Sequence, residues 1–211
     1  SHTSVSGIFN ALIHSRSFAW NGATTGIASW SDPANWGGAA PVAGSDVTIP
    51  SLSGLTVEFD AAAGSLALNS ITANSSLLIS GGTLTLGDTA GDVSTFVSGT
   101  SLNLTGGTLT GAGMLDDLGG FSWTGGALTG TATLDLTSAT LATLTNSVIN
   151  GMTVKLSDQI ATGTISNLTL QTGQIVNSGV ANITAGDTFT MTGGSLTTDD
   201  LSLAGTFNWS G

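Results

Sequence analysis

The chain has 211 residues and a formal net charge of −11, since thirteen acidic residues are set against two basic ones. With only Arg16 and Lys155 as cations, it lacks the basic groups that neutralise phosphates, which argues against nucleic-acid binding and against anionic membrane surfaces. There is no cysteine, and no apolar run approaches the roughly 18 residues of a transmembrane helix, so we expect no membrane span.

Residues 1–46 are predicted to form an N-terminal cap. Within residues 7–14 the apolar side chains fall on one helical face, which favours a short helix, with a short strand pair as the alternative. The remainder is rich in loop signals, and Trp20, Trp30 and Trp36 supply the apolar area that anchors such loops. We expect these tryptophans to pack on the first coil. The alternative is an exposed aromatic platform that binds carbohydrate.

Residues 47–211 alternate apolar and polar residues in short runs that are separated by turn residues, a pattern that predicts short strands. One motif recurs, with the form apolar-x-apolar-Ser/Thr-Gly-Gly-x-Leu-Thr. Its copies begin at Leu77, Leu102, Phe121, Phe189 and, cut short by the end of the sequence, Phe207. A repeat near 20 residues that contains strands and turns but no helix is the signature of a β-solenoid.

We therefore predict an all-β fold with roughly eight stacked coils over residues 47–211, ending inside a repeat, as expected for a fragment of a longer chain. Each coil would bury Leu, Ile, Val or Phe and expose Thr, Ser or Asn. Stacking satisfies every strand edge except those at the two ends. The uncovered last coil therefore predicts end-to-end self-association.

The cap and the repeats together carry a family resemblance. The cap contains Trp20-Asn-Gly, then Trp30-Ser-Asp-Pro-Ala-Asn-Trp36, then Pro41 and Asp46-Val-Thr-Ile-Pro50. With the repeats that follow, it resembles the opening module of large bacterial autotransporter-like surface β-solenoid proteins, over residues 18–211. The resemblance implies a right-handed parallel β-helix with an N-terminal cap, secreted or displayed on the bacterial cell surface.

The sequence offers few groups for catalysis. A polysaccharide lyase would need a basic side chain, and Lys155 is expected to point away from the core. A hydrolase needs two nearby carboxylates, but Asp116-Asp117 and Asp199-Asp200 are neighbours in sequence and would point to opposite faces of a strand, although as turn residues they could converge. The two histidines both lie close to the N-terminus. We predict that the chain is not an enzyme and has no catalytic residue.

Calcium binding requires only oxygen ligands, so a structural calcium site is an open alternative to ordinary surface acids. The candidate pairs are Asp88 with Asp92, Asp116 with Asp117, and Asp32 with Asp46. None matches an EF-hand loop or a calcium-binding nonapeptide repeat. No other cofactor is expected.

Threonine pairs of the form Thr-x-Thr could align as a flat ladder, as in ice-binding solenoids. They occur at residues 83–85, 108–110, 131–133, 143–145, 188–190 and 190–192. Their uneven spacing argues against one aligned ladder, and the alternative is that threonine is simply a favoured exposed strand residue.

The predicted function is that of a non-enzymatic extracellular segment, structural or adhesive, of a bacterial cell-surface β-solenoid. Its expected partner is a surface glycan or the surface of another cell. The first alternative is a carbohydrate-binding module that uses Trp20, Trp30 and Trp36. The second is a polysaccharide lyase or hydrolase, which a carboxylate-lined groove with bound calcium would support.

Overall fold

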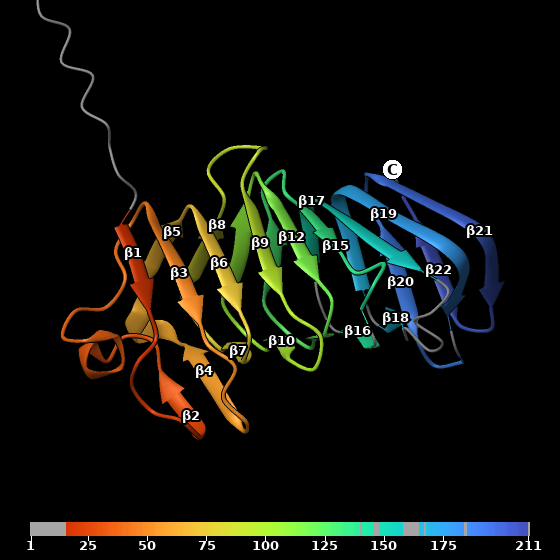
Figure 1. Cartoon of the computed structure of the whole chain (residues 1–211). Helices are drawn as coiled ribbons and strands as arrows, with labels where there is room; N and C mark the ends of the chain where they lie inside the picture. Colours follow the sequence, from red (N-terminus) through yellow and green to blue (C-terminus); the bar gives the residue numbers. More distant parts are fainter. Residues whose placement is uncertain are drawn as a thin grey trace, which may run out of the picture.

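The computed structural model of the chain describes residues 16–139, 141–145, 148–157, 165–166, 168–183 and 185–210. These residues form a β-solenoid of about seven turns, in which parallel strands of successive turns stack along one axis (Figure 1). The all-β parallel solenoid predicted from the sequence is confirmed. The helix predicted for residues 7–14 lies outside the described residues.

One turn of the solenoid, here called a rung, varies in length. Register partners on neighbouring rungs are 24 residues apart at Asp46 and Ser70 but 19 residues apart at Met114 and Thr133. The difference arises mainly in the connections at the corners. The result is about seven rungs, where an even period near 20 predicted roughly eight.

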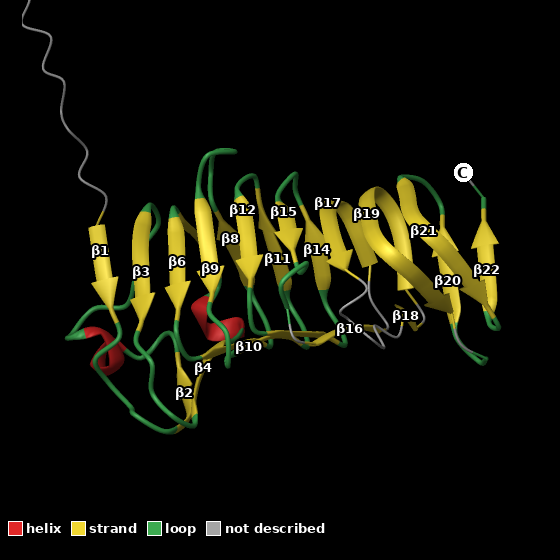
Figure 2. Ribbon diagram, turned by 45° about the vertical axis from the view of Figure 1, so that its right-hand side comes forward, coloured by secondary structure: helices red, strands yellow, loops and turns green. Residues whose placement is uncertain are grey.

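Each rung has three faces, and Figure 2 shows the strands of the first face side by side along the solenoid. Face 1 contains β1 (Arg16–Ala19), β3 (Ser45–Ile49), β6 (Ser70–Ala73), β9 (Val93–Phe96), β12 (Met114–Asp117) and β15 (Thr133–Asp135), followed by parts of β17 (Val148–Ser157), β19 (Leu168–Ile183) and β21 (Ser195–Leu203). The three long strands bend round corners and so serve more than one face.

The chain then passes to face 3 and to face 2 before it returns to face 1. Face 3 contains β2 (Gly26–Ser29), β4 (Leu55–Phe59), β7 (Ser76–Ile79), β10 (Ser101–Leu104), β13 (Gly120–Trp123), β16 (Leu141–Thr145) and β18 (Ile165–Ser166). Face 2 contains β5 (Ser65–Leu68), β8 (Thr83–Leu86), β11 (Thr108–Gly111), β14 (Ala127–Thr129), the first residues of β17 and β19, β20 (Thr188–Met191) and β22 (Thr206–Trp209).

The core consists of columns of inward side chains, because alternate residues of each strand point into the solenoid. On face 3 one column contains residues that are register partners from rung to rung and are all buried. Its members are Phe59, Ile79, Leu104, Trp123 and Leu144. Burial of each such side chain contributes about 1.5–3 kcal/mol relative to exposure, and stacking in register makes this burial continuous along the solenoid.

Glycines line two of the corners, where successive rungs approach too closely for a side chain. At the corner between faces 3 and 2, Gly107 has a φ of 68°, and a Cβ there would lie 2.6 Å from the Gly82 carbonyl oxygen. At the corner between faces 2 and 1, a Cβ on Gly194 would lie 2.6 Å from the Gly173 oxygen. The repeated Gly-Gly motif therefore occupies different corners, the first in residues 81–82, 106–107 and 125–126 and the second in 193–194.

The predicted cap of residues 1–46 contributes the first rung as well as loops. Within it, β1 pairs with β3 and β2 pairs with β4, so the stack begins before residue 47. The loop after β2 contains a short 3-10 helix, η1 (Pro33–Trp36), and a second, η2 (Ala61–Ala63), follows β4. Among the described residues, no helix has the length and apolar character needed to cross a membrane.

Candidate functional site

The three cap tryptophans form a buried aromatic cluster. Trp20, Trp30 and Trp36 are exposed by 3%, 1% and 6%. The Trp36 ring lies 5.0 Å from the Trp20 ring and 4.9 Å from the Trp30 ring, and Trp30 also contacts Phe59 at 5.6 Å between ring centroids. A carbohydrate platform needs exposed ring faces, so the binding role predicted for these residues as an alternative fails, and their role is to pack the cap.

Hydrogen bonds fix two of these rings in place. The indole N–H of Trp20 donates to the Ala23 carbonyl at 2.8 Å, and that of Trp36 donates to the Trp30 carbonyl at 2.6 Å. Asn35, also buried, donates to the Ser29 carbonyl and accepts from the Ala23 N–H. The polar groups of the cap are therefore used to close its own loops.

Asp88 and Asp92 lie in the loop between β8 and β9, and Asp92 closes that loop. Its Oδ2 accepts from the N–H groups of Asp88 and Thr89, at 3.1 and 3.0 Å, and from the Thr89 hydroxyl at 3.1 Å. The N–H of Thr89 is the main cause that lowers the pKa of the Asp92 carboxyl below its ordinary value. This carboxylate holds protein donors, as a turn residue does, and the calcium prediction gains no geometric support here.

Asp116 and Asp117 point to opposite sides of β12. Asp116 faces outward and is half-buried, whereas Asp117 is fully buried in the solenoid interior. They lie on a strand, so the convergence that a turn would have allowed does not occur and the pair forms no joint calcium or hydrolase site. Among the described residues, no group of three or more His, Cys, Asp or Glu side chains is placed to hold a metal ion.

Asp117 is an acid in an apolar column. Its register partner on the preceding rung is Phe96, and its Oδ1 accepts from the Gly119 N–H at 2.9 Å. The Oδ2 atom is buried without a hydrogen-bond partner in the described structure. Burial disfavours the charged form and, with a smaller contribution from the charge of Asp116, raises the pKa of Asp117 to about 6 despite the Gly119 hydrogen bond.

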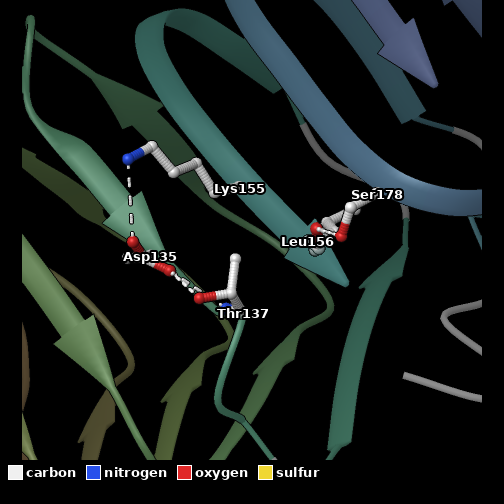
Figure 3. A network of polar contacts seen from close by, with 5 residues as sticks. All are labelled: Asp135, Thr137, Lys155, Leu156 and Ser178. Atoms are coloured by element: carbon white, nitrogen blue, oxygen red, sulfur yellow. Dashed lines mark hydrogen bonds and ion pairs between the residues drawn. The ribbon is translucent and has the colours of Figure 1, made fainter. Parts of the chain in front are cut away.

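Lys155 lies on the outer surface of face 1, as predicted, and pairs with an acid on the preceding rung. Its Nζ is 3.7 Å from Asp135 Oδ2, and the two residues are register partners (Figure 3). The other oxygen of Asp135 accepts from the Thr137 N–H at 3.0 Å and from its hydroxyl at 2.6 Å. Lys155 is thus held in a surface ion pair, an arrangement that suits a structural role and leaves no free base for a lyase mechanism.

The remaining acidic pair, Asp199 and Asp200, lies in β21, and both residues are exposed. Asp200 Oδ1 accepts from the Leu201 N–H at 2.8 Å. In the cap, Asp32 accepts from the Ala34 N–H at the start of η1, and Asp46 accepts from the Ser70 hydroxyl. Each of these carboxylates contacts a nearby donor of the chain.

Face 2 has a different outer surface. Thr83 lies beside Thr108, and Thr85 lies beside Thr110, on neighbouring rungs. Thr129 continues this face, and Val148 with Asn150 interrupts the threonines on the next rung. The pair at 131–133 ends on face 1 and the pair at 143–145 lies on face 3, so the Thr-x-Thr pairs do not form one ladder, in agreement with their uneven spacing.

No Asp, Glu, Lys or Arg occurs in the described strand segments of face 2, from β5 to β22. Face 1, in contrast, carries Asp46, Asp116, Asp135 and Lys155 on its strands. The outward residues of face 2 are mostly Thr, Ser and Asn, repeated at about 4.8 Å between rungs and about 6.6 Å along a strand. Sequence reasoning missed this neutral face, because only the register reveals which threonines share it.

A polar trough lies at the corner between faces 1 and 3. Its volume is about 460 Å³, and it forms because the connection at residues 74–75 is shorter than those at 50–54 and 97–100 on the flanking rungs. Ser75, at its base, donates to the Pro50 carbonyl at 2.6 Å and accepts from the Leu52 N–H at 3.0 Å. This hydroxyl joins neighbouring rungs, which makes the base of the trough structural.

Comparisons of the chain with models of known protein families, with curated proteins and with solved structures find no match. Function must therefore be inferred from the geometry of the chain itself.

Proposed function

We propose that this chain is a non-enzymatic, extracellular segment of a bacterial cell-surface β-solenoid, and that it serves as a structural rod whose face 2 adheres to neutral glycans. The observation that carries this proposal is the segregation of charge. The strand segments of face 2 are free of charged residues, although the chain as a whole has a net charge of −11.

The chemistry of face 2 suits a neutral, polyhydroxylated partner. Threonine and serine hydroxyls both donate and accept hydrogen bonds, as sugar hydroxyls do. Contact with a neutral surface requires no desolvation of ionised groups, which would be costly. Anionic glycans are disfavoured, because the many carboxylates elsewhere on the chain repel them.

The stacked architecture supplies repetition, which is what adhesion through weak contacts requires. Each rung presents similar groups at about 4.8 Å from the next, so a polymer or a polymer surface could contact several rungs at once. The rung-to-rung hydrogen bonds and the glycine corners hold these groups in fixed register. Rigid presentation lowers the entropy that is lost on binding.

The proposal is tested by a binding screen on neutral and anionic glycans, run with the wild type and two double variants. Thr85→Lys with Thr110→Lys places two cations on face 2, on register partners. Thr72→Lys with Thr95→Lys makes the same change on register partners of face 1. All four side chains point outward, so the two variants are matched in chemistry and in expected folding.

We expect the wild type to bind neutral glycans and the face 2 variant to lose at least about tenfold in affinity, or about 1.4 kcal/mol, whereas the face 1 variant keeps its affinity. Equal loss in both variants would place the contact elsewhere. No binding of any glycan by the wild type would remove the adhesive part of the proposal. The extracellular part is tested separately, by protease digestion of intact source cells, which should cleave the protein if it is displayed on their surface.

A further inference from the structure

The last rung leaves several large apolar side chains uncovered. Leu201, Leu203 and Trp209 are exposed by 38%, 52% and 71%. They belong to β21 and β22, which pair with β19 and β20 on their inner edges and with no other described strand. Both the side chains and the outer backbone edges of these two strands therefore face solvent.

The same positions are buried one rung earlier. The register partners of Leu201, Leu203 and Trp209 are Ala181, Ile183 and Met191, which are exposed by 4%, 1% and 6%. These positions belong to inward columns, and on every earlier rung the following rung covers them. Their exposure on the last rung is therefore a property of position in the stack, since the residue types are those of the core.

The uncovered side chains surround an apolar hollow of about 360 Å³. It is lined by Met191, Leu196, Leu201, Phe207 and Trp209. Phe207 stacks on Phe189 of the preceding rung, with ring centroids 5.5 Å apart, and so forms the floor that the next layer would cover. Exposed apolar surface of this kind beside unpaired strand edges favours association.

The opposite end of the solenoid is closed. Trp20, Trp30 and Trp36 fill the first rung, and the Gly44 N–H donates to the Ala67 carbonyl of β5, the edge strand of face 2, at 2.9 Å. Among the described residues of this end, Ile27 is the most exposed large apolar side chain, at 68%. The N-terminal end thus offers no apolar surface that matches the C-terminal hollow.

We propose that two copies of this chain associate tail to tail through the outer edges of β21 and β22. An isologous contact covers both apolar ends at once and closes, whereas head-to-tail stacking would place the hollow of one copy against the closed cap of the next. The two-fold axis brings the edge strands together antiparallel, which lets their free N–H and C=O groups pair. The inference depends only on this surface and does not depend on the proposed adhesive function.

Charge opposes the contact and gives it a signature. Asp199 and Asp200 are exposed in β21, so a tail-to-tail dimer brings four carboxylates towards one another, between two chains of net charge −11. Salt screens this repulsion. The dimer should therefore become stronger as the ionic strength rises, while the apolar area supplies the attraction.

The test is sedimentation velocity of the 211-residue chain over a range of concentrations, at low and at high salt. We expect a monomer–dimer equilibrium that shifts towards dimer in high salt, with no larger species. Leu203→Lys combined with Trp209→Lys should raise the dissociation constant at least about tenfold, because it places like charges on both sides of the contact. Both side chains are already exposed, so the variant should keep the wild-type circular dichroism spectrum and urea midpoint.

The matched control is Ile27→Lys, the same change at an exposed apolar residue of the opposite end, which should leave the dimer unchanged. Three results would overturn the proposal. One is a monomer at every concentration and salt. Another is open-ended oligomers that Ile27→Lys weakens, since these are head-to-tail. The third is a dimer that the double Lys variant leaves intact, since that dimer uses another surface.

Discussion

At the N-terminal end of the solenoid three tryptophans are buried under a folded loop, whereas at the C-terminal end Trp209 lies on an uncovered edge. Trp30 and Trp209 are the same residue type, and both belong to inward columns of the stack. What separates them is whether another layer covers them. In a solenoid, burial is set by neighbours along the axis, so a residue's contribution to stability follows from its rung as much as from its chemistry.

The strongest test of this comparison is to remove one tryptophan from each end. Trp30→Ala should lower the free energy of unfolding by about 3–5 kcal/mol, because it opens a cavity among Trp36, Phe59 and the first rung. Trp209→Ala should change it by less than about 0.5 kcal/mol, since the side chain is exposed. Urea unfolding of dilute monomer measures both. Similar losses at the two ends would break the comparison.

Glycines sharpen the comparison, because the corner columns reach from the closed end towards the open one. Gly82 has a φ of 69°, and a Cβ there would lie 3.0 Å from the Asp60 carbonyl oxygen and even closer to that of Gly64. Gly82→Ala should cost about 2–5 kcal/mol, the sum of a left-handed alanine and an overpacked contact.

Gly186 is the matched control near the open end. Its φ is 92°, but a Cβ would meet nothing within 4 Å, so Gly186→Ala should cost only the conformational part, about 1–2 kcal/mol. The same urea experiment gives both values. If the two substitutions cost equally, close approach between rungs does not limit the glycine column.

Asp117 tests whether the weakest point lies inside the stack and not at an end. Its pKa is about 6 in the folded chain and has its ordinary value of 3.8 when unfolded. Between these values the unfolded state binds fewer protons, so the free energy of unfolding falls as the pH rises from about 4 to about 6 and then stays lower, by on the order of 3 kcal/mol. Urea unfolding across this pH range measures the slope.

Asp117→Asn removes the ionisable group and should flatten that slope, whatever its effect on stability at a single pH. The control is Asp116→Asn, one residue away on the outer side of β12, which should keep most of the slope. A slope that survives in Asp117→Asn would show that another group causes it.

The smallest effect is expected on the outer surface, which neither end covers. Lys155→Gln should cost less than about 1 kcal/mol, because the ion pair with Asp135 is solvent-exposed on the lysine side and is screened by salt. Asp135→Asn should cost more, since Asp135 also accepts two hydrogen bonds from Thr137. Thermal unfolding at low and high salt separates the two contributions; only the ion pair should weaken with salt.

The repeated Gly-Gly motif shows how far sequence reasoning reached. It predicted the stack and its approximate period, because alternating residues and turn glycines are local signals. It also treated the copies at residues 106–107 and 193–194 as equivalent, yet they lie at different corners. A ten-residue match describes a strand, a turn and a strand, and any corner of a three-faced solenoid can use that unit.

The candidate sites divide in the same way. The outward position of Lys155 followed from strand alternation and is confirmed. The burial of Trp30 could not be distinguished from exposure on a platform, because the residues that cover it, such as Phe59, are distant in the sequence. The neutral face was hidden for the same reason, since Thr85 and Thr110 become neighbours only through the register of β8 and β11.

The sequence alone determined the fold class, the alternation of core and surface residues, and the scarcity of charge, because these depend on each residue and its near neighbours. The tertiary structure decided which residues share a face, which tryptophan is covered, and that Asp117 is turned inward. These properties depend on corner lengths and on contacts between residues about 20 apart, and a shift of one residue in register would exchange the inner and outer faces of a strand.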